Sequence, residues 1–180
     1  SSENMNRPSE EVGLLFKLFL TVLRNETKKL KDNNIKLDII GDLSVFTPEI
    51  QNLAEKAQQQ LQNNTGLNLV IAANYGGQWD ITEAAKKIAA KAANGEIAPE
   101  TVDKNIFGDH TALAQYPRVD LLIRTSGEVR ISNFLLWDIA YSELYFCDTL
   151  WPDFDANDLD IAINSFHSRD RRFGERNGEK

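Results

Sequence analysis

The chain has 180 residues, with 20 Lys and Arg against 27 Asp and Glu, a formal net charge of −7, and 42% hydrophobic residues. This composition is ordinary for a globular protein and too apolar for a disordered one. The acidic balance argues against duplex nucleic acid as a partner, because that binding needs a cationic surface.

The first half of the chain alternates predicted helices and strands. A helix begins at Pro8, which suits a first helical turn, and the carboxylates behind it complement the helix dipole. The alternation of apolar and polar residues over 35–40 predicts a strand. A second helix begins at Thr47, and the apolar run 67–74 predicts a strand buried on both faces.

The second half continues the same pattern. Its expected elements are a helix over 79–93, a shorter helix from Pro99, a strand over 119–123, a helix over 133–142, a strand over 144–146 and a helix over 155–172. Strands alternating with helices predict an α/β fold whose mostly parallel central sheet is covered by helices on both faces. We find no repeat or linker, so a single domain over 1–180 is expected.

The strongest local signal is the loop from Arg124 to Asn133. Two guanidiniums, those of Arg124 and Arg130, flank a glycine-centred turn that leads to Ser132. Arginine forks match phosphate oxygens, and a helix start adds backbone N–H donors. The pattern predicts an anion site for a phosphate or diphosphate. The alternative is that both arginines pair with nearby acids and Ser132 caps a helix.

Three weaker polar clusters accompany this loop. Glu143 stands among apolar residues, so it either pairs with an arginine or holds a cation such as Mg²⁺. Asn4 and Arg7 form a second cluster, for which helix capping is the alternative. The last turn of the final helix is expected to be cationic, with anion binding or a dimer contact as the alternative; its residues are Arg169, Arg171 and Arg172.

Six motifs in order resemble the cis-prenyltransferase family, in particular its bacterial undecaprenyl diphosphate synthases. They are Ser2-Glu3-Asn4-x-x-Arg7-Pro8, Asn74-Tyr75-Gly76-Gly77, Arg124-Thr125-Ser126-Gly127-Glu128-x-Arg130-Ile131-Ser132-Asn133-Phe134, Glu143-Leu144-Tyr145-Phe146, Trp151-Pro152-Asp153-Phe154 and Arg169-x-Arg171-Arg172-Phe173-Gly174. The resemblance extends from residue 1 to about residue 174.

The resemblance implies a Mg²⁺-dependent enzyme that adds isopentenyl diphosphate to an allylic diphosphate such as farnesyl diphosphate. Each new double bond is cis, and bacterial members make the undecaprenyl lipid carrier for cell-wall synthesis. Isopentenyl diphosphate would bind three residues: Arg124, Arg130 and Ser132. Glu143 would help coordinate Mg²⁺, either within one protomer or across a homodimer interface. Asn4 would act at the reacting centre, with Arg7 as a substrate-binding residue beside it.

The first helix has a further implied role. By resemblance it helps to wall a tunnel for the growing chain, with core packing as the alternative for its apolar residues: Leu14, Leu15, Leu18 and Phe19. The product would go to a membrane. The chain itself shows no spanning segment or secretory leader, and one cysteine, Cys147, permits no internal disulfide. We therefore expect a cytoplasmic protein, peripheral to the inner face of the membrane.

Several positions depart from the family pattern. The family's Asp-Gly-Asn segment, which binds the allylic diphosphate and Mg²⁺, is not found, and the only methionine is Met5. We therefore expect an amino-terminally truncated piece of a longer enzyme. Met5, Gln78 and Val129 stand where the family often has Trp, Arg and His. Loss of the aspartate segment also keeps open an alternative, a non-catalytic accessory subunit of a prenyltransferase.

Overall fold

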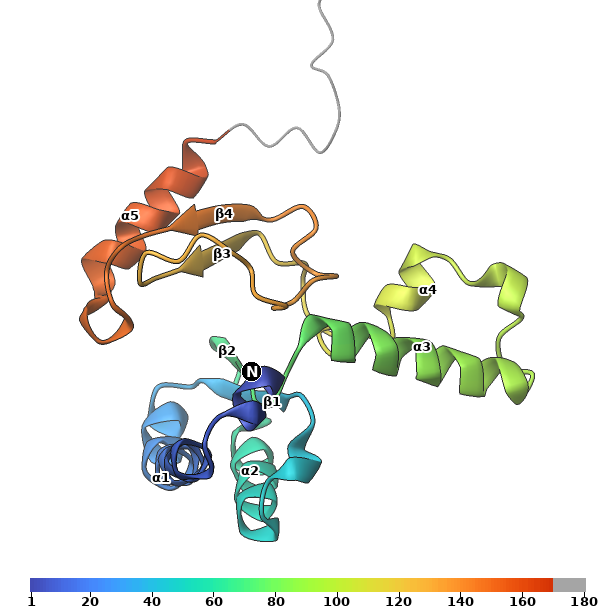
Figure 1. Cartoon of the computed structure of the whole chain (residues 1–180), viewed down its shortest axis with the longest axis horizontal. Coiled ribbons are helices and arrows are strands. Elements are labelled where there is room, and N and C mark those ends of the chain that lie inside the picture. Colours follow the sequence, from blue (N-terminus) through green and yellow to red (C-terminus); the bar gives the residue numbers. More distant parts are fainter. Residues whose placement is uncertain (170–180) are drawn as a thin grey trace, which may run out of the picture. The chain divides into compact units, whose positions relative to one another are not determined.

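A computed structural model describes residues 1–169 of the chain (Figure 1). The chain divides into two compact units, an amino-terminal unit over 1–112 and a carboxy-terminal unit that begins at Leu113. Both units contain a pair of parallel strands with helices, so the expected α/β class with parallel strands is confirmed. The expectation of a single domain over 1–180 stays a prediction.

The amino-terminal unit holds most of the helices. Its elements are η1 (Ser2–Asn6), α1 (Ser9–Asp32), β1 (Lys36–Ile40), η2 (Leu43–Val45), α2 (Pro48–Leu61), β2 (Asn68–Ala72), α3 (Gly77–Ala93), η3 (Pro99–Thr101) and α4 (Lys104–Gly108). The short helix expected from Pro99 is thus two pieces, η3 and α4. The second piece begins at Lys104 and is capped by Asp103, whose carboxylate accepts the backbone N–H groups of Asn105 and Ile106.

The core of this unit forms where α1 and α2 pack together and against β1. The Phe46 ring lies 4.8 Å from that of Phe16 and 5.5 Å from that of Phe19, measured between centroids. Leu37 of β1 and Leu61 of α2 are almost wholly buried. Each such burial stabilises the fold by roughly 1.5–3 kcal/mol. This packing fixes β1 in place, and β2 pairs with it in register from Lys36↔Asn68 to Ile40↔Ala72.

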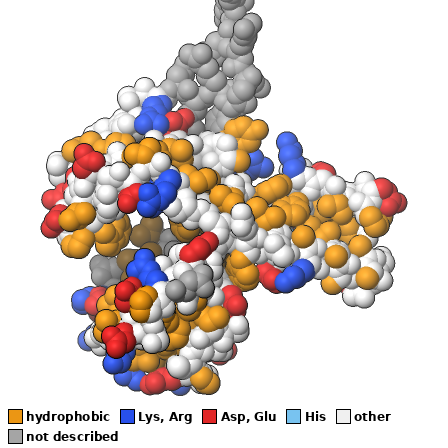
Figure 2. Space-filling view, viewed as in Figure 1, with side chains coloured by type: hydrophobic (Ala, Val, Ile, Leu, Met, Phe, Trp, Pro, Cys, Tyr) orange, Lys and Arg blue, Asp and Glu red, His pale blue; other side chains and the backbone are white. Residues whose placement is uncertain are grey.

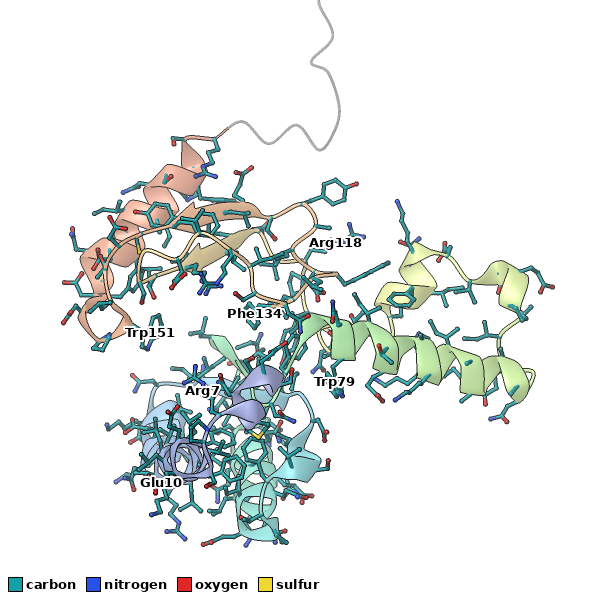
Figure 3. All side chains as sticks on the ribbon, viewed as in Figure 1. Arg7, Glu10, Trp79, Arg118, Phe134 and Trp151 are labelled. Carbon is teal, nitrogen blue, oxygen red and sulfur yellow. The ribbon has the colours of Figure 1, made fainter. Side chains whose placement is uncertain are left out.

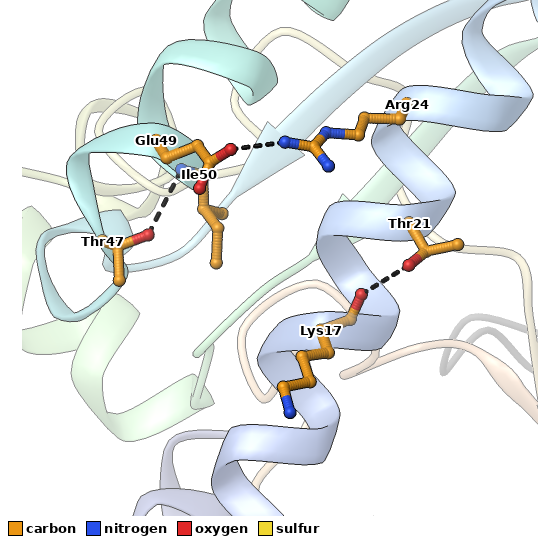
Figure 4. A network of polar contacts seen from close by, with 6 residues as sticks. All are labelled: Lys17, Thr21, Arg24, Thr47, Glu49 and Ile50. Atoms are coloured by element: carbon orange, nitrogen blue, oxygen red, sulfur yellow. Dashed lines mark hydrogen bonds and ion pairs between the residues drawn. The ribbon is translucent and has the colours of Figure 1, made fainter.

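Polar contacts at the rim join α1 to the start of α2 (Figure 4). The Arg24 guanidinium pairs with the Glu49 carboxylate in the first turn of α2. Thr47 caps that turn, since its hydroxyl accepts the Ile50 N–H at 3.5 Å. Figure 4 also shows the Thr21 hydroxyl donating to the Lys17 carbonyl at 2.8 Å within α1.

The second predicted strand is less buried than its apolar sequence suggests. In β2 and just before it, Leu67 is 67% exposed and Leu69 is 36% exposed. The expectation that this run is buried on both faces is wrong for the described residues. The physical reason is that α1 and α2 make their main strand contacts with β1, and within β2 it is Ile71 that packs against their core rather than the more exposed Leu69.

Alanines make up much of the surface of α3. On the face shown in Figure 2, hydrophobic side chains gather over α3 and α4. Helix α3 contains six alanines, and Ala84 and Ile88 face its buried side. The exposed part of this surface therefore carries methyl groups rather than large apolar side chains.

The carboxy-terminal unit is built on a second parallel pair. Strands β3 (Leu121–Arg124) and β4 (Glu143–Phe146) pair in register, and η4 (Trp151–Asp153) precedes α5 (Ala156–His167). A capping box begins α5: Asp155 accepts backbone N–H groups from Asn157 and Asp158, and the Asp158 carboxylate accepts the Asp155 N–H. Helix α5 packs on β4 and buries Ala162 completely.

One helix prediction is wrong in this unit, and a second helix ends earlier than predicted. Residues 133–142 form successive turns instead of a helix. Asn133 and Leu135 have φ of +59° and +47°, and residues in this left-handed region cannot continue a right-handed helix. Helix α5 ends at His167, so Arg169 lies beyond the last turn, while Arg171 and Arg172 lie outside the described residues.

Gly41 is the tightest backbone position in the amino-terminal unit. Its φ is +112°, and a Cβ there would lie 2.0 Å from the Ala73 carbonyl oxygen. We expect Gly41→Ala to lower the free energy of unfolding by about 2 kcal/mol or more, because the left-handed conformation is strained and the carbonyl is backbone that must shift. Urea unfolding followed by circular dichroism measures the change.

Two other glycines are matched controls. Gly95 has φ of +73° with open space around it, so Gly95→Ala should cost about 1 kcal/mol from the conformation alone. Gly13 lies inside α1 with nothing within 4 Å, so Gly13→Ala should stabilise by about 0.5–1 kcal/mol. Equal losses for Gly41→Ala and Gly95→Ala would contradict the close approach of the two strand ends.

Candidate functional site

In the amino-terminal unit, the carboxyl ends of β1 and β2 are tied together by Asn74. Its side-chain amide donates to the Asp42 carbonyl at 3.0 Å, and its own carbonyl accepts the Asp42 N–H at 3.3 Å. Asn74 is 9% exposed, has φ of +48°, and its Oδ1 atom is buried without a hydrogen-bond partner in the structure. Ligands of parallel sheets gather at such strand ends.

The predicted cluster of Asn4 and Arg7 lies beside this loop. The Ser2 N–H donates to the Tyr75 carbonyl at 3.0 Å, which seats η1 against the turn after β2. Asn4 is half-buried, and its carbonyl accepts the Arg7 N–H at 3.1 Å, so part of its role is local capping. Arg7 is exposed (Figure 3), and its guanidinium lies 3.7 Å from the Glu11 carboxylate.

Sequence reasoning missed the buried carboxylate that holds this turn. The Tyr75 hydroxyl donates to Asp80 Oδ2 at 2.7 Å, and the Ala112 N–H donates to Asp80 Oδ1 at 2.8 Å. Asp80 is 3% exposed although it stands in the first turn of α3, where an acid normally faces solvent. The signal in the sequence was weak, because an acid near a helix start is fully explained by the helix dipole.

In the carboxy-terminal unit, the Arg124 side chain closes the predicted anion loop. Its Nη1 donates to the Arg130 carbonyl at 2.6 Å and to the Ser132 hydroxyl at 2.8 Å. The structure therefore brings together all three predicted residues of this loop. Within the part of the chain that the structure describes, the alternative of pairing with a nearby acid is not found for Arg124, whose Nη1 binds the loop itself, and its binding of an anion stays a prediction.

Backbone contacts hold the same loop against the chain that follows β4. The Ser126 N–H donates to the Thr149 carbonyl at 2.8 Å, and the Gly127 N–H donates to the Cys147 carbonyl at 2.9 Å. Ser126 and Ser132 both have positive φ, of +70° and +44°. The Ser126 and Gly127 N–H groups are therefore taken by backbone carbonyls, and these hydrogen bonds fix the shape of the loop.

Arg130 is the exposed cation of the loop. Its guanidinium pairs with the carboxylate of Glu128, and 60% of its side chain is exposed. The alternative of pairing with a nearby acid is therefore correct for Arg130. Such an exposed pair is worth about 0–1 kcal/mol, so a phosphate can displace the carboxylate at little cost.

Glu143 lies at the opposite end of the strand pair from Arg124. It begins β4 opposite Leu121, three residues before Arg124 on β3, which corresponds to about 10 Å along a parallel strand. Its carboxylate accepts from the Arg169 guanidinium at 2.8 Å. Pairing with an arginine is therefore correct for Glu143, whose side chain is still 25% exposed, and its binding of a cation stays a prediction.

The residues present suit Mg²⁺ only where water and substrate phosphates supply most of its ligands. Among residues 1–169, no three His, Cys, Asp or Glu side chains gather in a group that could hold a metal ion. Mg²⁺ commonly takes one or two carboxylates and completes its shell with water and substrate phosphates. The Glu143 carboxylate fits that donor set as a single protein ligand.

The apolar residues of α1 divide into two groups. Phe19 packs against Phe46 in the core, as the alternative of core packing predicted. Leu14 is 64% exposed and Leu18 is 60% exposed, four residues apart on the same side of the helix. Among the described residues, no helix is long and apolar enough to cross a bilayer.

Comparisons with known proteins cover nearly the whole chain. A family model described as "Putative undecaprenyl diphosphate synthase" matches residues 1–174. The ditrans,polycis-undecaprenyl-diphosphate synthase ((2E,6E)-farnesyl-diphosphate specific) of Vibrio parahaemolyticus is 54% identical over 174 residues, which are 97% of this chain and 69% of the relative. The synthase of the same name from Escherichia coli K12 is 49% identical with the same coverage.

A solved structure shows the same fold. The lavandulyl diphosphate synthase of Lavandula x intermedia, in complex with dimethylallyl diphosphate, matches with a TM-score of 0.93 and 39% identity over 97% of this chain and 75% of that one. The family model spans all six sequence motifs. This chain therefore belongs to the undecaprenyl diphosphate synthase family of cis-prenyltransferases.

Proposed function

We propose that the full-length protein condenses isopentenyl diphosphate with farnesyl diphosphate to make a long cis-polyprenyl diphosphate, the undecaprenyl carrier of bacterial cell-wall synthesis. The observation that carries the proposal is the loop closed by Arg124, which presents the exposed Arg130 guanidinium and the Ser132 hydroxyl together. The names of relatives that are about half identical specify farnesyl diphosphate and an undecaprenyl diphosphate product.

The proposed reaction releases the diphosphate of the allylic substrate while the loop residues hold the diphosphate of the other substrate. The allylic C–O bond breaks and releases diphosphate, a new C–C bond forms to the terminal alkene carbon of isopentenyl diphosphate, and one proton leaves. Arg130 binds the diphosphate of isopentenyl diphosphate in exchange for Glu128, and Arg124 keeps the loop in shape. When bound, Mg²⁺ neutralises diphosphate charge, and Glu143 is the residue that would hold it.

Asn4 and Arg7 take roles on the other substrate in this proposal. Both lie beside the loop after β2, where η1 is fixed by the Ser2 to Tyr75 hydrogen bond. Asn4 would act at the reacting centre, and Arg7 would bind diphosphate by releasing its exposed contact with Glu11.

The exposed residues of α1 fit the growing hydrocarbon chain. Leu14 and Leu18 offer apolar surface along one side of the helix, which an elongating polyprenyl group would cover. The product is a lipid, so we further propose that the protein works in the cytoplasm at the inner face of the membrane.

A homodimer would explain the position of Glu143. Within one chain Glu143 lies at the end of the β3–β4 pair opposite to Arg124. In a two-fold dimer, Glu143 of one protomer can serve the loop of its partner. The proposal of a homodimer rests on this geometry and on the family resemblance.

The direct test incubates the full-length protein with Mg²⁺, farnesyl diphosphate and labelled isopentenyl diphosphate. We expect elongated polyprenyl products that disappear when EDTA removes the metal. Absence of any elongated product would refute the proposed activity. Product formation only after a second, different subunit is added would instead establish an accessory role.

Substitution of the two loop arginines separates binding from loop structure. Arg130→Ala should raise the KM for isopentenyl diphosphate about 10- to 100-fold with little loss of stability, because it removes a charged hydrogen bond to the ligand. Arg124→Gln should raise the KM and also lower the free energy of unfolding by about 1 kcal/mol, since two loop contacts are lost. Steady-state kinetics and urea unfolding measure the two effects.

Arg118 supplies the matched control for these variants. It is an exposed arginine of the same unit outside the loop. Arg118→Gln should leave both the KM and the unfolding midpoint unchanged. An equal rise in KM for Arg118→Gln and Arg130→Ala would point to general loss of positive charge instead of a specific site.

Subunit complementation tests whether Glu143 acts across a dimer. Arg124→Gln and Glu143→Gln chains should each be poorly active alone. If the site is shared, mixed refolding should restore about a quarter of the normal activity, because half of the dimers are mixed and each has one intact site. Activity that stays at the level of the two separate variants would place Glu143 and Arg124 in the same protomer's site.

A further inference from the structure

Arg169 joins the end of α5 to the start of β4. Its Nη1 donates to Glu143 Oε2 at 2.8 Å and to the Leu144 carbonyl at 3.0 Å. The backbone at this point continues the end of the helix, since the Arg169 N–H donates to the Phe166 carbonyl at 3.2 Å. A single guanidinium nitrogen therefore holds two adjacent residues of the strand.

The Leu144 carbonyl that Arg169 binds lies on the edge of β4 away from β3. The N–H groups of Glu143 and Cys147 donate to the carbonyls of Asp120 and Arg124, on the β3 side. In a parallel pair, alternate residues face the same neighbour, so the intervening Leu144 peptide faces the other edge. Arg169 is thus anchored to a backbone group whose position the sheet fixes.

This anchor determines how the Glu143 carboxylate is turned. Nη1 carries two hydrogens, and the two acceptors use both of them. Oε2 of Glu143 is therefore directed at Arg169, while residues 1–169 supply no donor to Oε1. The side chains are 25% exposed for Glu143 and 38% exposed for Arg169, so Oε1 can be reached by a ligand.

We infer that Arg169 is a positioning residue for the metal: it holds Oε2 of Glu143 and thereby presents Oε1 to Mg²⁺. The inference rests on the proposed function, in which Glu143 is a metal ligand. Partners that orient a metal-binding carboxylate commonly change metal affinity 10- to 100-fold when removed. Repulsion between the guanidinium and Mg²⁺ acts in the opposite direction, but solvent screens it at a site this exposed.

The test measures Mg²⁺ binding to the full-length protein by isothermal titration calorimetry, with isopentenyl diphosphate present and no allylic substrate, so that no turnover occurs. Arg169→Gln should raise the Kd for Mg²⁺ about 10-fold. Arg169→Lys should have a smaller effect, because the ammonium keeps the charge and can still reach one acceptor.

A double variant shows whether Arg169 acts through Glu143. If it does, adding Arg169→Gln to Glu143→Gln should weaken Mg²⁺ binding no further than Glu143→Gln alone. Full additivity of the two effects, or an unchanged Kd in Arg169→Gln, overturns the inference. An unchanged Kd in Glu143→Gln overturns the metal assignment as well, whereas the formation of polyprenyl product tests the proposed reaction separately.

Hydrogen exchange of the metal-free protein supplies a readout independent of Mg²⁺. Arg169→Gln should increase exchange in the last turn of α5, because its anchor to β4 is lost. If Arg169→Gln does not fold, Arg169→Lys carries the test of Mg²⁺ affinity. Arg118→Gln, an exposed arginine of the same unit, should change neither measurement, and an equal effect there would also overturn the inference.

Discussion

The candidate diphosphate loop depends on one guanidinium, that of Arg124. Its two hydrogen bonds, to the Arg130 carbonyl and the Ser132 hydroxyl, join the end of β3 to the far side of the loop. Left-handed residues such as Ser132 and Asn133 cost free energy by themselves, of the order of 1–3 kcal/mol each, so they persist only where the surroundings hold them. Because Arg124 holds the loop through the Arg130 carbonyl, the Arg130 side chain remains exposed to a ligand.

Three of the four charged residues expected to bind ligands are already paired within their own units. Arg7 lies beside Glu11, Arg130 pairs with Glu128, and Glu143 pairs with Arg169, and each pair is partly exposed. Exposed pairs contribute little to stability, so exchanging a carboxylate for a phosphate costs little. Such pairs keep the side chains oriented before a ligand arrives, which reduces the ordering that binding requires.

In the amino-terminal unit, the strand ends are held in position by buried packing instead of by exposed ion pairs. The packing of α1 and α2 on β1 fixes the strand, and the close approach of Gly41 to the Ala73 carbonyl leaves no room for a side chain. Asn74 and the buried Asp80 then set the turn against which η1 rests. The position of Asn4 and Arg7 is therefore a consequence of core packing several residues away.

The sequence alone determined the α/β class, the approximate extent of α1, α2, α3 and the strands, and the grouping of Arg124, Arg130 and Ser132, because these follow from local periodicity, capping and turn chemistry. Only the tertiary structure decided that 133–142 forms turns: its apolar spacing resembles a helix, but Asn133 and Leu135 lie at positive φ, and Arg124 holds Ser132 immediately before them. It also decided that Glu143 lies away from Arg124 and beside Arg169. Strand register and side-chain pairing depend on groups far apart in the chain, which no local pattern encodes.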